Sequence, residues 1–187
     1  MFNLPNILSL LRIALIPVLV IIYFLPYESE TIAIWATIIF AIASITDWLD
    51  GYLARKWEQT SAFGAFLDPV ADKLIVAVAL LLVLYKNPEW YVLVPVIIII
   101  GREITISALR EWMAEIGQRN VVKVSYVGKL KTSFQMLAIG CLIFHNSLFG
   151  LPIFDIGLVL LYIASALTIS SMWSYLSAAW PIMKAKG

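Results

Sequence analysis

Four aspartates within a short stretch are the residues whose type and spacing point most directly to chemistry. Asp47 and Asp50 lie three positions apart and therefore share one face of a helix. Asp68 and Asp72 lie four positions apart and share a face in the same way. Carboxylates this close repel one another unless cations compensate their charge, and each is costly to bury inside a membrane. The four together predict a cation site.

The ligand type indicates which cation such a site would hold. Hard oxygen ligands with no Cys or His among them favour Mg²⁺, Mn²⁺ or Ca²⁺, and a two-metal site is the natural stoichiometry for four carboxylates. We expect two ions, Mg²⁺ or Mn²⁺. Helix capping or pairing with Lys and Arg would explain Asp50 or Asp68 separately, but not the whole set. The lone Cys141 lies in an apolar run, where packing is its expected role.

Composition places these aspartates in a membrane protein. Of the 187 residues 62% are hydrophobic, and the mean hydropathy is +0.93. Because a spanning helix needs about 20 mainly apolar residues, we expect an all-α, polytopic fold with six transmembrane helices in a single domain over residues 1–187. The first apolar stretch lacks a cleavage signal and is read as retained. The expected spans are 7–25, 32–54, 66–85, 90–113, 125–146 and 153–180.

The basic residues indicate how these helices are oriented. Lys and Arg near the span ends are retained on the cytoplasmic side. With the N-terminus inside, every basic residue except Lys86 falls in the inner half of the protein. Six spans then place both termini in the cytoplasm. The formal net charge is only +1, which gives no argument for nucleic acid as a partner.

Depth along the helices brings the aspartates to one level. The second expected helix enters at the outer side near Ile32, and a rise of about 1.5 Å per residue places Asp47 about 22 Å across a core about 30 Å thick. The third expected helix begins near Phe66 on the inner side, so Asp68 and Asp72 occupy its first two turns. The predicted site therefore lies near the cytoplasmic face.

The aspartates belong to the longer pattern Asp47-x2-Asp50-Gly51-x2-Ala54-Arg55-x8-Gly64-x3-Asp68-x3-Asp72. At every defined position it resembles the signature of the CDP-alcohol phosphatidyltransferase family, and eight fixed positions at fixed spacing make a specific match. The family has six membrane helices and a site near the cytoplasmic face, in agreement with the expected spans. Residues 101–104 and 107–115 are similar to the bacterial members that use sn-glycerol 3-phosphate.

The resemblance implies a reaction in which a hydroxyl of sn-glycerol 3-phosphate attacks the lipid-side phosphorus of CDP-diacylglycerol and CMP leaves. Asp47, Asp50 and Asp68 would hold the metal. Asp72 would act as the general base and also contact a second ion. A homodimer among the lipids of a bacterial inner membrane is implied as well. The residues expected around the CDP moiety are Asn6, Arg12, Gly51, Ala54, Arg55 and Gly64.

Some of these CDP candidates also have simpler explanations. Asn6, Ser9 and Arg12 follow one another at intervals of three residues and form a polar stripe on the first helix. Such a stripe would equally suit the interfacial end of a helix. Gly51 leaves room for the substrate near the backbone, but close helix packing explains it too. Gly64 is equally suited to a turn.

The phosphate of the acceptor needs cations of its own. Arg110 lies near the inner end of the fourth expected helix, and Lys129 and Lys131 lie in the first turns of the fifth. Arg suits bidentate phosphate contacts, whereas Lys acts as a point charge. The two lysines point about 200° apart on a regular helix, so we expect one of them to face the pocket. Arg102 is a further candidate, with an internal ion pair to Glu103 as the alternative.

Two other functions fit parts of the sequence. Enzymes for serine, inositol and inositol phosphate share the signature, so another alcohol acceptor is the main alternative. Intramembrane carboxylates also build ion or proton carriers. Carrier sites usually lie near the membrane midplane between internal repeats. In this sequence the carboxylates lie near the inner face and no repeat is visible, which favours the enzyme.

Overall fold

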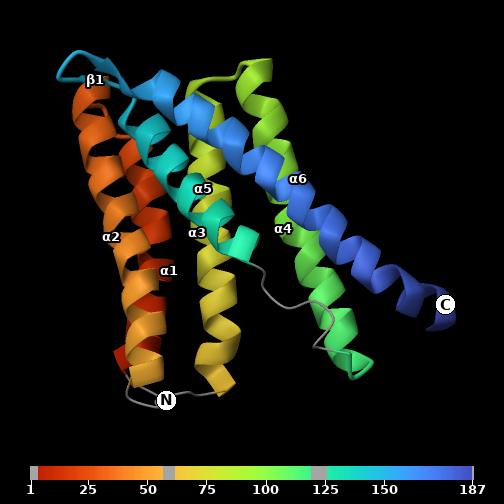
Figure 1. Cartoon of the computed structure of the whole chain (residues 1–187). Helices are drawn as coiled ribbons and strands as arrows, with labels where there is room; N and C mark the ends of the chain where they lie inside the picture. Colours follow the sequence, from red (N-terminus) through yellow and green to blue (C-terminus); the bar gives the residue numbers. More distant parts are fainter. Residues whose placement is uncertain (1–3, 57–61, 119–125, 187) are drawn as a thin grey trace.

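The chain folds into a bundle of α-helices with one short hairpin (Figure 1). This computed structural model describes residues 4–56, 62–118 and 126–186. The helices are α1 (Leu4–Tyr23), α2 (Ser29–Lys56), α3 (Ala62–Lys86), α4 (Trp90–Glu115), α5 (Tyr126–Phe144) and α6 (Ile153–Lys186). The strands β1 (Ser147–Leu148) and β2 (Leu151–Pro152) pair antiparallel between α5 and α6. The prediction of an all-α protein is confirmed.

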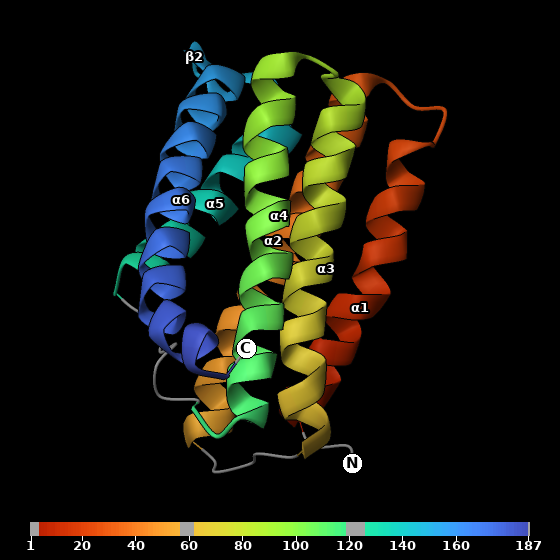
Figure 2. The same ribbon diagram turned by 90° about the vertical axis from the view of Figure 1, so that its right-hand side faces the viewer.

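Successive helices run in opposite directions because short connections join them (Figures 1 and 2). The α1–α2 turn, the α3–α4 connection and the β1–β2 hairpin lie at one end of the bundle, the hairpin end. Both chain termini lie toward the opposite end in Figure 2. At that end Gly117, with φ +76°, lets the chain leave α4, and the Gln118 amide donates to the Met113 carbonyl at 2.8 Å in a Schellman motif.

Two apolar clusters hold the helices together. The larger cluster lies mainly between α1, α2, α3 and α5, where Leu19, Leu80 and Ile139 are fully buried. The smaller cluster joins α4 to α6 and contains Met113 and Tyr175. Members of both clusters, Val76 of the larger and Tyr175 of the smaller, line one polar pocket. The packing of the bundle therefore surrounds a polar space.

Within the part of the chain that the structure describes, four helices are long and apolar enough to cross a membrane, over Asn6–Tyr23, Ser29–Asp47, Trp90–Glu115 and Ile153–Lys184. α5 has a shorter apolar stretch, Leu130–Phe144. α3 contains 25 residues but carries Asp68, Asp72 and Lys73 in its first half. The chain is a membrane protein, and the count of six spans stays a prediction.

Two local features differ from the prediction. α3 begins at Ala62 rather than near Phe66, so Asp68 and Asp72 lie in its second and third turns and not in its first two. Hydropathy predicts only the apolar part of a helix, but backbone hydrogen bonds extend the helix into the residues that precede it. The hairpin has no counterpart in the prediction. Its two central residues, Phe149 and Gly150, have φ of 53° and 80°, as a two-residue type I′ turn requires.

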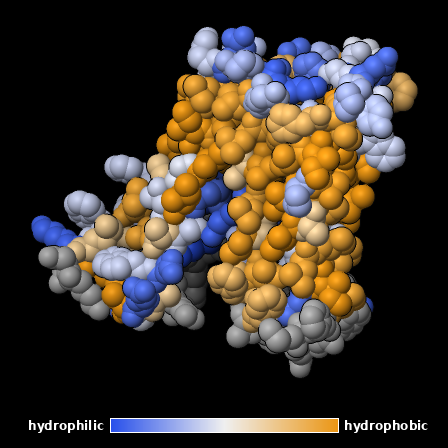
Figure 3. All heavy atoms as spheres, turned by 180° about the vertical axis from the view of Figure 1, so that it is seen from behind, coloured by the Kyte–Doolittle hydropathy of each residue, from blue (hydrophilic) through white to orange (hydrophobic). Residues whose placement is uncertain are grey.

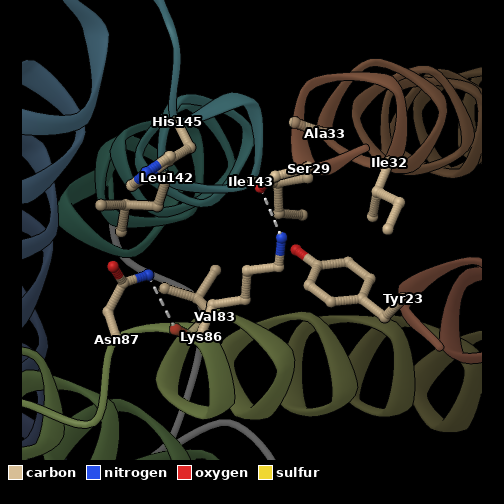
Figure 4. A pocket seen from close by; sticks show the side chains of 10 residues that line it. All are labelled: Tyr23, Ser29, Ile32, Ala33, Val83, Lys86, Asn87, Leu142, Ile143 and His145. Carbon is tan, nitrogen blue, oxygen red and sulfur yellow. Dashed lines mark hydrogen bonds between the residues drawn. The ribbon is translucent and has the colours of Figure 1, made fainter. Parts of the chain in front are cut away.

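Figure 4 shows how α1, α2 and α3 are joined at the hairpin end. The Lys86 ammonium donates to the Ser29 hydroxyl at 3.0 Å and lies 5.9 Å from the centre of the Tyr23 ring. His145 lines the same cavity, whose volume of about 10 Å³ has room for about one water molecule. This cavity is too small for a substrate, so its side chains serve packing.

Candidate active site

A polar pocket of about 390 Å³ lies where all six of the described helices meet. Each helix contributes at least one side chain to its lining. Figure 3, which views the molecule from behind, shows hydrophilic residues in a recess between two hydrophobic masses. The charged and hydrogen-bonding residues that line the pocket are Arg12, Asp47, Asp68, Asp72, Lys73, Arg102, Glu103, Arg110, Thr132, Gln135 and Tyr175.

The acidic side of the pocket is organised by α1. Arg12 is fully buried, and its Nη1 lies 3.1 Å from the Asp47 Oδ1 of α2. The same nitrogen also forms an ion pair with Asp72 of α3. One turn earlier on α1, the Ser9 hydroxyl donates to Asp68. The polar stripe on the first helix, which begins with the buried Asn6, therefore faces the aspartates.

The donor set fits a hard cation, because its members are carboxylate oxygens from facing helices. Asp47 and Asp72 come close enough to share one positive group, and Arg12 provides that group in this arrangement. Among the described side chains, no three acidic, His or Cys groups converge closely enough to hold one metal ion. Asp50 lies outside the described side chains. A bound divalent ion would use the carboxylates of α2 and α3 that share the Arg12 guanidinium in this structure.

The opposite wall of the pocket is basic and aromatic. Arg110 donates from Nη2 to the Tyr175 hydroxyl at 3.4 Å, and its guanidinium carbon lies 5.4 Å from the centre of the Tyr175 ring. The guanidinium carbon of Arg102 lies 5.8 Å from the same ring. Arg102 also donates to Ser171 at 3.5 Å and forms an ion pair with Glu103 at 3.0 Å. Two arginines from α4 thus flank one tyrosine from α6.

The lysines predicted for the acceptor phosphate are placed differently. Lys131 is fully buried and forms an ion pair with Glu103, which itself lines the pocket. Lys131 therefore compensates the charge of a lining residue without lining the pocket itself. Lys129 lies outside the described side chains. The prediction that one of the two faces the pocket stays open.

Several of the residues predicted to bind CDP cannot be placed. Gly51, Ala54 and Arg55 fall in the last turns of α2, and their side chains lie outside those that the structure describes. Gly64 is buried in the first turn of α3 and is not part of the pocket lining. Arg12 is the CDP candidate that lines the pocket among those described.

Sequence reasoning missed other polar residues of the lining. Lys73 follows Asp72 directly and was read only as an inner-side charge. Gln135 is a buried amide in an apolar helix, so the rule that intramembrane polar residues are functional would have found it. Tyr175 had no local signal, since its partner Arg110 lies 65 positions earlier.

Comparison with known proteins gives consistent matches over nearly the whole chain. The family model of the CDP-alcohol phosphatidyltransferases matches residues 2–170, which include every residue of the pocket lining except Tyr175. A Haemophilus influenzae protein named CDP-diacylglycerol–glycerol-3-phosphate 3-phosphatidyltransferase is 52% identical over 179 residues, covering 95% of this chain and 94% of that protein. Proteins of the same name from Pectobacterium atrosepticum and Escherichia coli K12 are 50% and 48% identical, and each match covers 95% of both chains.

Proposed function

Because the chain belongs to the CDP-alcohol phosphatidyltransferase family, we propose that it transfers the phosphatidyl group of CDP-diacylglycerol to sn-glycerol 3-phosphate. The products are phosphatidylglycerophosphate and CMP. The observation that carries the proposal is a single pocket with an acidic wall on α2 and α3 and a basic wall on α4. A donor diphosphate held through a divalent cofactor at the acidic wall and an acceptor phosphate at the basic wall would occupy such a pocket together.

The chemistry of the transfer is a displacement at phosphorus. The acceptor hydroxyl oxygen forms a bond to the lipid-side phosphorus, and the bond from that phosphorus to the CMP oxygen breaks. CMP leaves with the bonding electron pair. The proton of the attacking hydroxyl passes to a carboxylate, for which Asp72 is our candidate because it lines the pocket and matches the last aspartate of the family pattern.

Asp47, Asp50, Asp68 and Asp72 would hold the divalent cofactor, Mg²⁺ or Mn²⁺ with two ions expected. When bound, it neutralises the diphosphate and the charge that develops on the leaving CMP. Arg12 supports this assignment, because one positive group already joins the carboxylates of α2 and α3. On CDP binding Arg12 would exchange one carboxylate partner for a phosphate. Asn6, Gly51, Ala54, Arg55 and Gly64 remain our candidates for the rest of the CDP site.

The acceptor phosphate is assigned to the basic wall. Arg110 and Arg102 both line the pocket, with their guanidinium carbons 5.4 Å and 5.8 Å from the centre of the Tyr175 ring. Arg is suited to phosphate because its planar fork makes two parallel hydrogen bonds. Lys131 fixes Glu103 through their ion pair. Lys129 remains a further candidate for binding the acceptor phosphate.

The location of the enzyme follows from the same proposal. We place six spans in a bacterial inner membrane, with both termini and the pocket toward the cytoplasm, where the soluble acceptor is available. The termini at the end opposite the hairpin support placing both on one side of the membrane, and the basic residues favour the cytoplasmic side. A homodimer is proposed from the family resemblance.

The test is release of CMP by purified protein in detergent. With CDP-diacylglycerol, Mg²⁺ and sn-glycerol 3-phosphate we expect CMP, and a chelator should stop its release until Mg²⁺ or Mn²⁺ is restored. Serine, inositol and inositol phosphate should be poor acceptors. Absence of CMP with sn-glycerol 3-phosphate, while another alcohol supports release, would reject the acceptor assignment. Absence with all four would reject the enzyme.

The proposed base is tested by one substitution in the same assay. Asp72→Asn should lower kcat by about 10²- to 10⁴-fold, because the amide cannot accept the proton. Asp155→Asn is the matched control, since Asp155 is exposed in the first turn of α6 at the hairpin end. Unchanged kcat in Asp72→Asn would remove this residue from the mechanism.

A further inference from the structure

An apolar groove runs between α3 and α4, beside the polar pocket. Its volume is about 200 Å³, and its apolar lining consists of Leu74, Val76, Ala77, Ile99, Ile100 and Ile104. The two helices pack against each other, and Figure 2 shows them side by side on the face toward the viewer. The groove therefore lies on the side of the bundle, where the membrane would be.

The groove is continuous with the polar pocket. Lys73, Val76 and Glu103 line both spaces. Lys73 is half-buried and forms no ion pair with any side chain that the structure describes. A ligand that begins in the polar pocket can thus pass this cation and continue into apolar surroundings.

The charged residues of the groove lie near the middle of the two helices. Lys73 and Glu103 are close to the midpoints of α3 and α4, Ile104 directly follows Glu103, and Ala77 lies four residues further along α3 toward the hairpin end. Four residues of helix correspond to about 6 Å. The rims are open to the outside, since Leu74 is 44% exposed and Ile104 is 66% exposed. The groove thus leads from the charged pocket to the outer side of the bundle.

We propose that this groove binds one acyl chain of the CDP-linked lipid donor. The inference rests on the proposed function, which places the two phosphates of that lipid in the polar pocket. Its glycerol ester must then lie at the edge of the pocket and its chains must leave toward the bilayer. The groove offers that exit with an apolar lining, and Lys73 offers a cation at the seam beside the lipid-side phosphate. An acyl chain held in the groove would orient the lipid-side phosphorus for attack.

Filling the groove tests the inference. Ala77→Phe should raise KM for dipalmitoyl CDP-diacylglycerol by about tenfold, while KM for the dibutanoyl donor, whose chains end near the seam, should change less than about twofold. The matched control is Ala41→Phe on α2. Ala41 is exposed and lies six residues from Asp47, as Ala77 lies five from Asp72, so the two alanines are at similar depth. The control should leave both KM values unchanged.

The dibutanoyl donor separates the possible failures. If wild-type protein releases no CMP from either donor, the proposed function falls. If wild type is active and Ala77→Phe raises both KM values equally, or neither, the groove is not the acyl site. Should Ala77→Phe fail to fold, Ala77→Leu provides a smaller filling residue with the same expectation.

Photolabelling gives a readout that does not depend on turnover. A CDP-diacylglycerol with a diazirine near the carboxyl end of its acyl chain should label residues 73–77 or 99–104 of the wild-type protein. Excess unlabelled CDP-diacylglycerol should compete, whereas excess phosphatidylcholine should not. Labelling confined to other helices would show that the acyl chain does not enter the groove. Competition by both lipids would show that any membrane lipid occupies it. Either result would overturn the inference.

Discussion

Arg12 is the residue on which the charge balance of the acidic wall depends. It comes from α1, it is fully buried, and it contacts carboxylates of both α2 and α3. Loss of one partner from a buried ion pair leaves an uncompensated charge, which typically costs about 3–5 kcal/mol. The partial exposure of Asp47 and Asp72 in the pocket lowers that cost here, because water and ligands reach them. The proposed exchange of an Arg12 partner for a substrate phosphate would therefore cost less than it would in a closed core.

Arg110 allows the basic wall to be tested at the scale of one side chain. Arg110→Gln should raise KM for sn-glycerol 3-phosphate by about tenfold and leave KM for CDP-diacylglycerol within about twofold, because only the acceptor phosphate loses a charged partner. Initial rates of CMP release with each substrate varied in turn measure both values. Arg110→Lys keeps the charge and should recover part of the loss.

The control for this substitution is Lys184→Gln, which removes an exposed positive charge near the end of α6, outside the pocket lining. It should change neither KM. An equal rise of both KM values in Arg110→Gln would mean that the basic wall serves the donor as well, and would contradict the assignment of the two walls.

At the scale of the helices, α5 and α6 approach closely at one glycine. A Cβ added to Gly157 would lie 2.8 Å from the Cys141 Cβ and 3.0 Å from the Leu142 Cγ. Small residues at such crossings let helix backbones approach within a membrane. The crossing also positions Tyr175, which lies further along α6, against the arginines of α4. Packing between helices thus contributes to the geometry of the basic wall.

We expect Gly157→Val to destabilise the protein by about 1–3 kcal/mol, since the added side chain forces α5 and α6 apart. Thermal unfolding of the purified protein in detergent measures the change. Gly140→Ala is the matched control on α5, because an added Cβ there meets no atom within 4 Å and alanine is the better helix former. Equal unfolding temperatures for Gly157→Val and wild type would show that the crossing tolerates a larger residue.

At the scale of the whole molecule, six helices in alternating directions meet around one pocket. Each helix alone is mostly apolar and carries only a few of the polar residues that line the pocket. Together they place an acidic wall, a basic wall and an apolar groove within reach of one amphipathic substrate. The bundle therefore explains how a membrane-bound lipid and a soluble anion could meet in one site.

The orientation of the bundle can be tested by cysteine labelling in spheroplasts, with Cys141→Ala as the background. We expect Ser147→Cys in the hairpin to react with a membrane-impermeant maleimide from outside. Lys184→Cys near the end of α6 should react only after the membrane is opened, because the positive-inside rule places that end in the cytoplasm. The reverse labelling pattern would mean that the pocket faces outward, and would exclude a cytoplasmic acceptor.

The sequence by itself determined the helices and the register of the aspartates. Hydropathy and turn residues placed five helix starts within a few positions, and the start of α3 was wrong by about one turn because helices continue past their apolar length. That Asp68 and Asp72 share one face of a helix followed from the helical period alone, which is a local property. The family was evident from the same residues.

Only the tertiary structure decided which distant side chains meet. Arg12 lies 60 positions from Asp72, and Arg110 lies 65 positions from Tyr175, so no local spacing relates them. The groove beside Ala77 depends on how α3 and α4 cross, which the packing of many side chains sets at once. Helical period and hydropathy act within one segment, whereas the walls of this pocket are made where segments pack against each other.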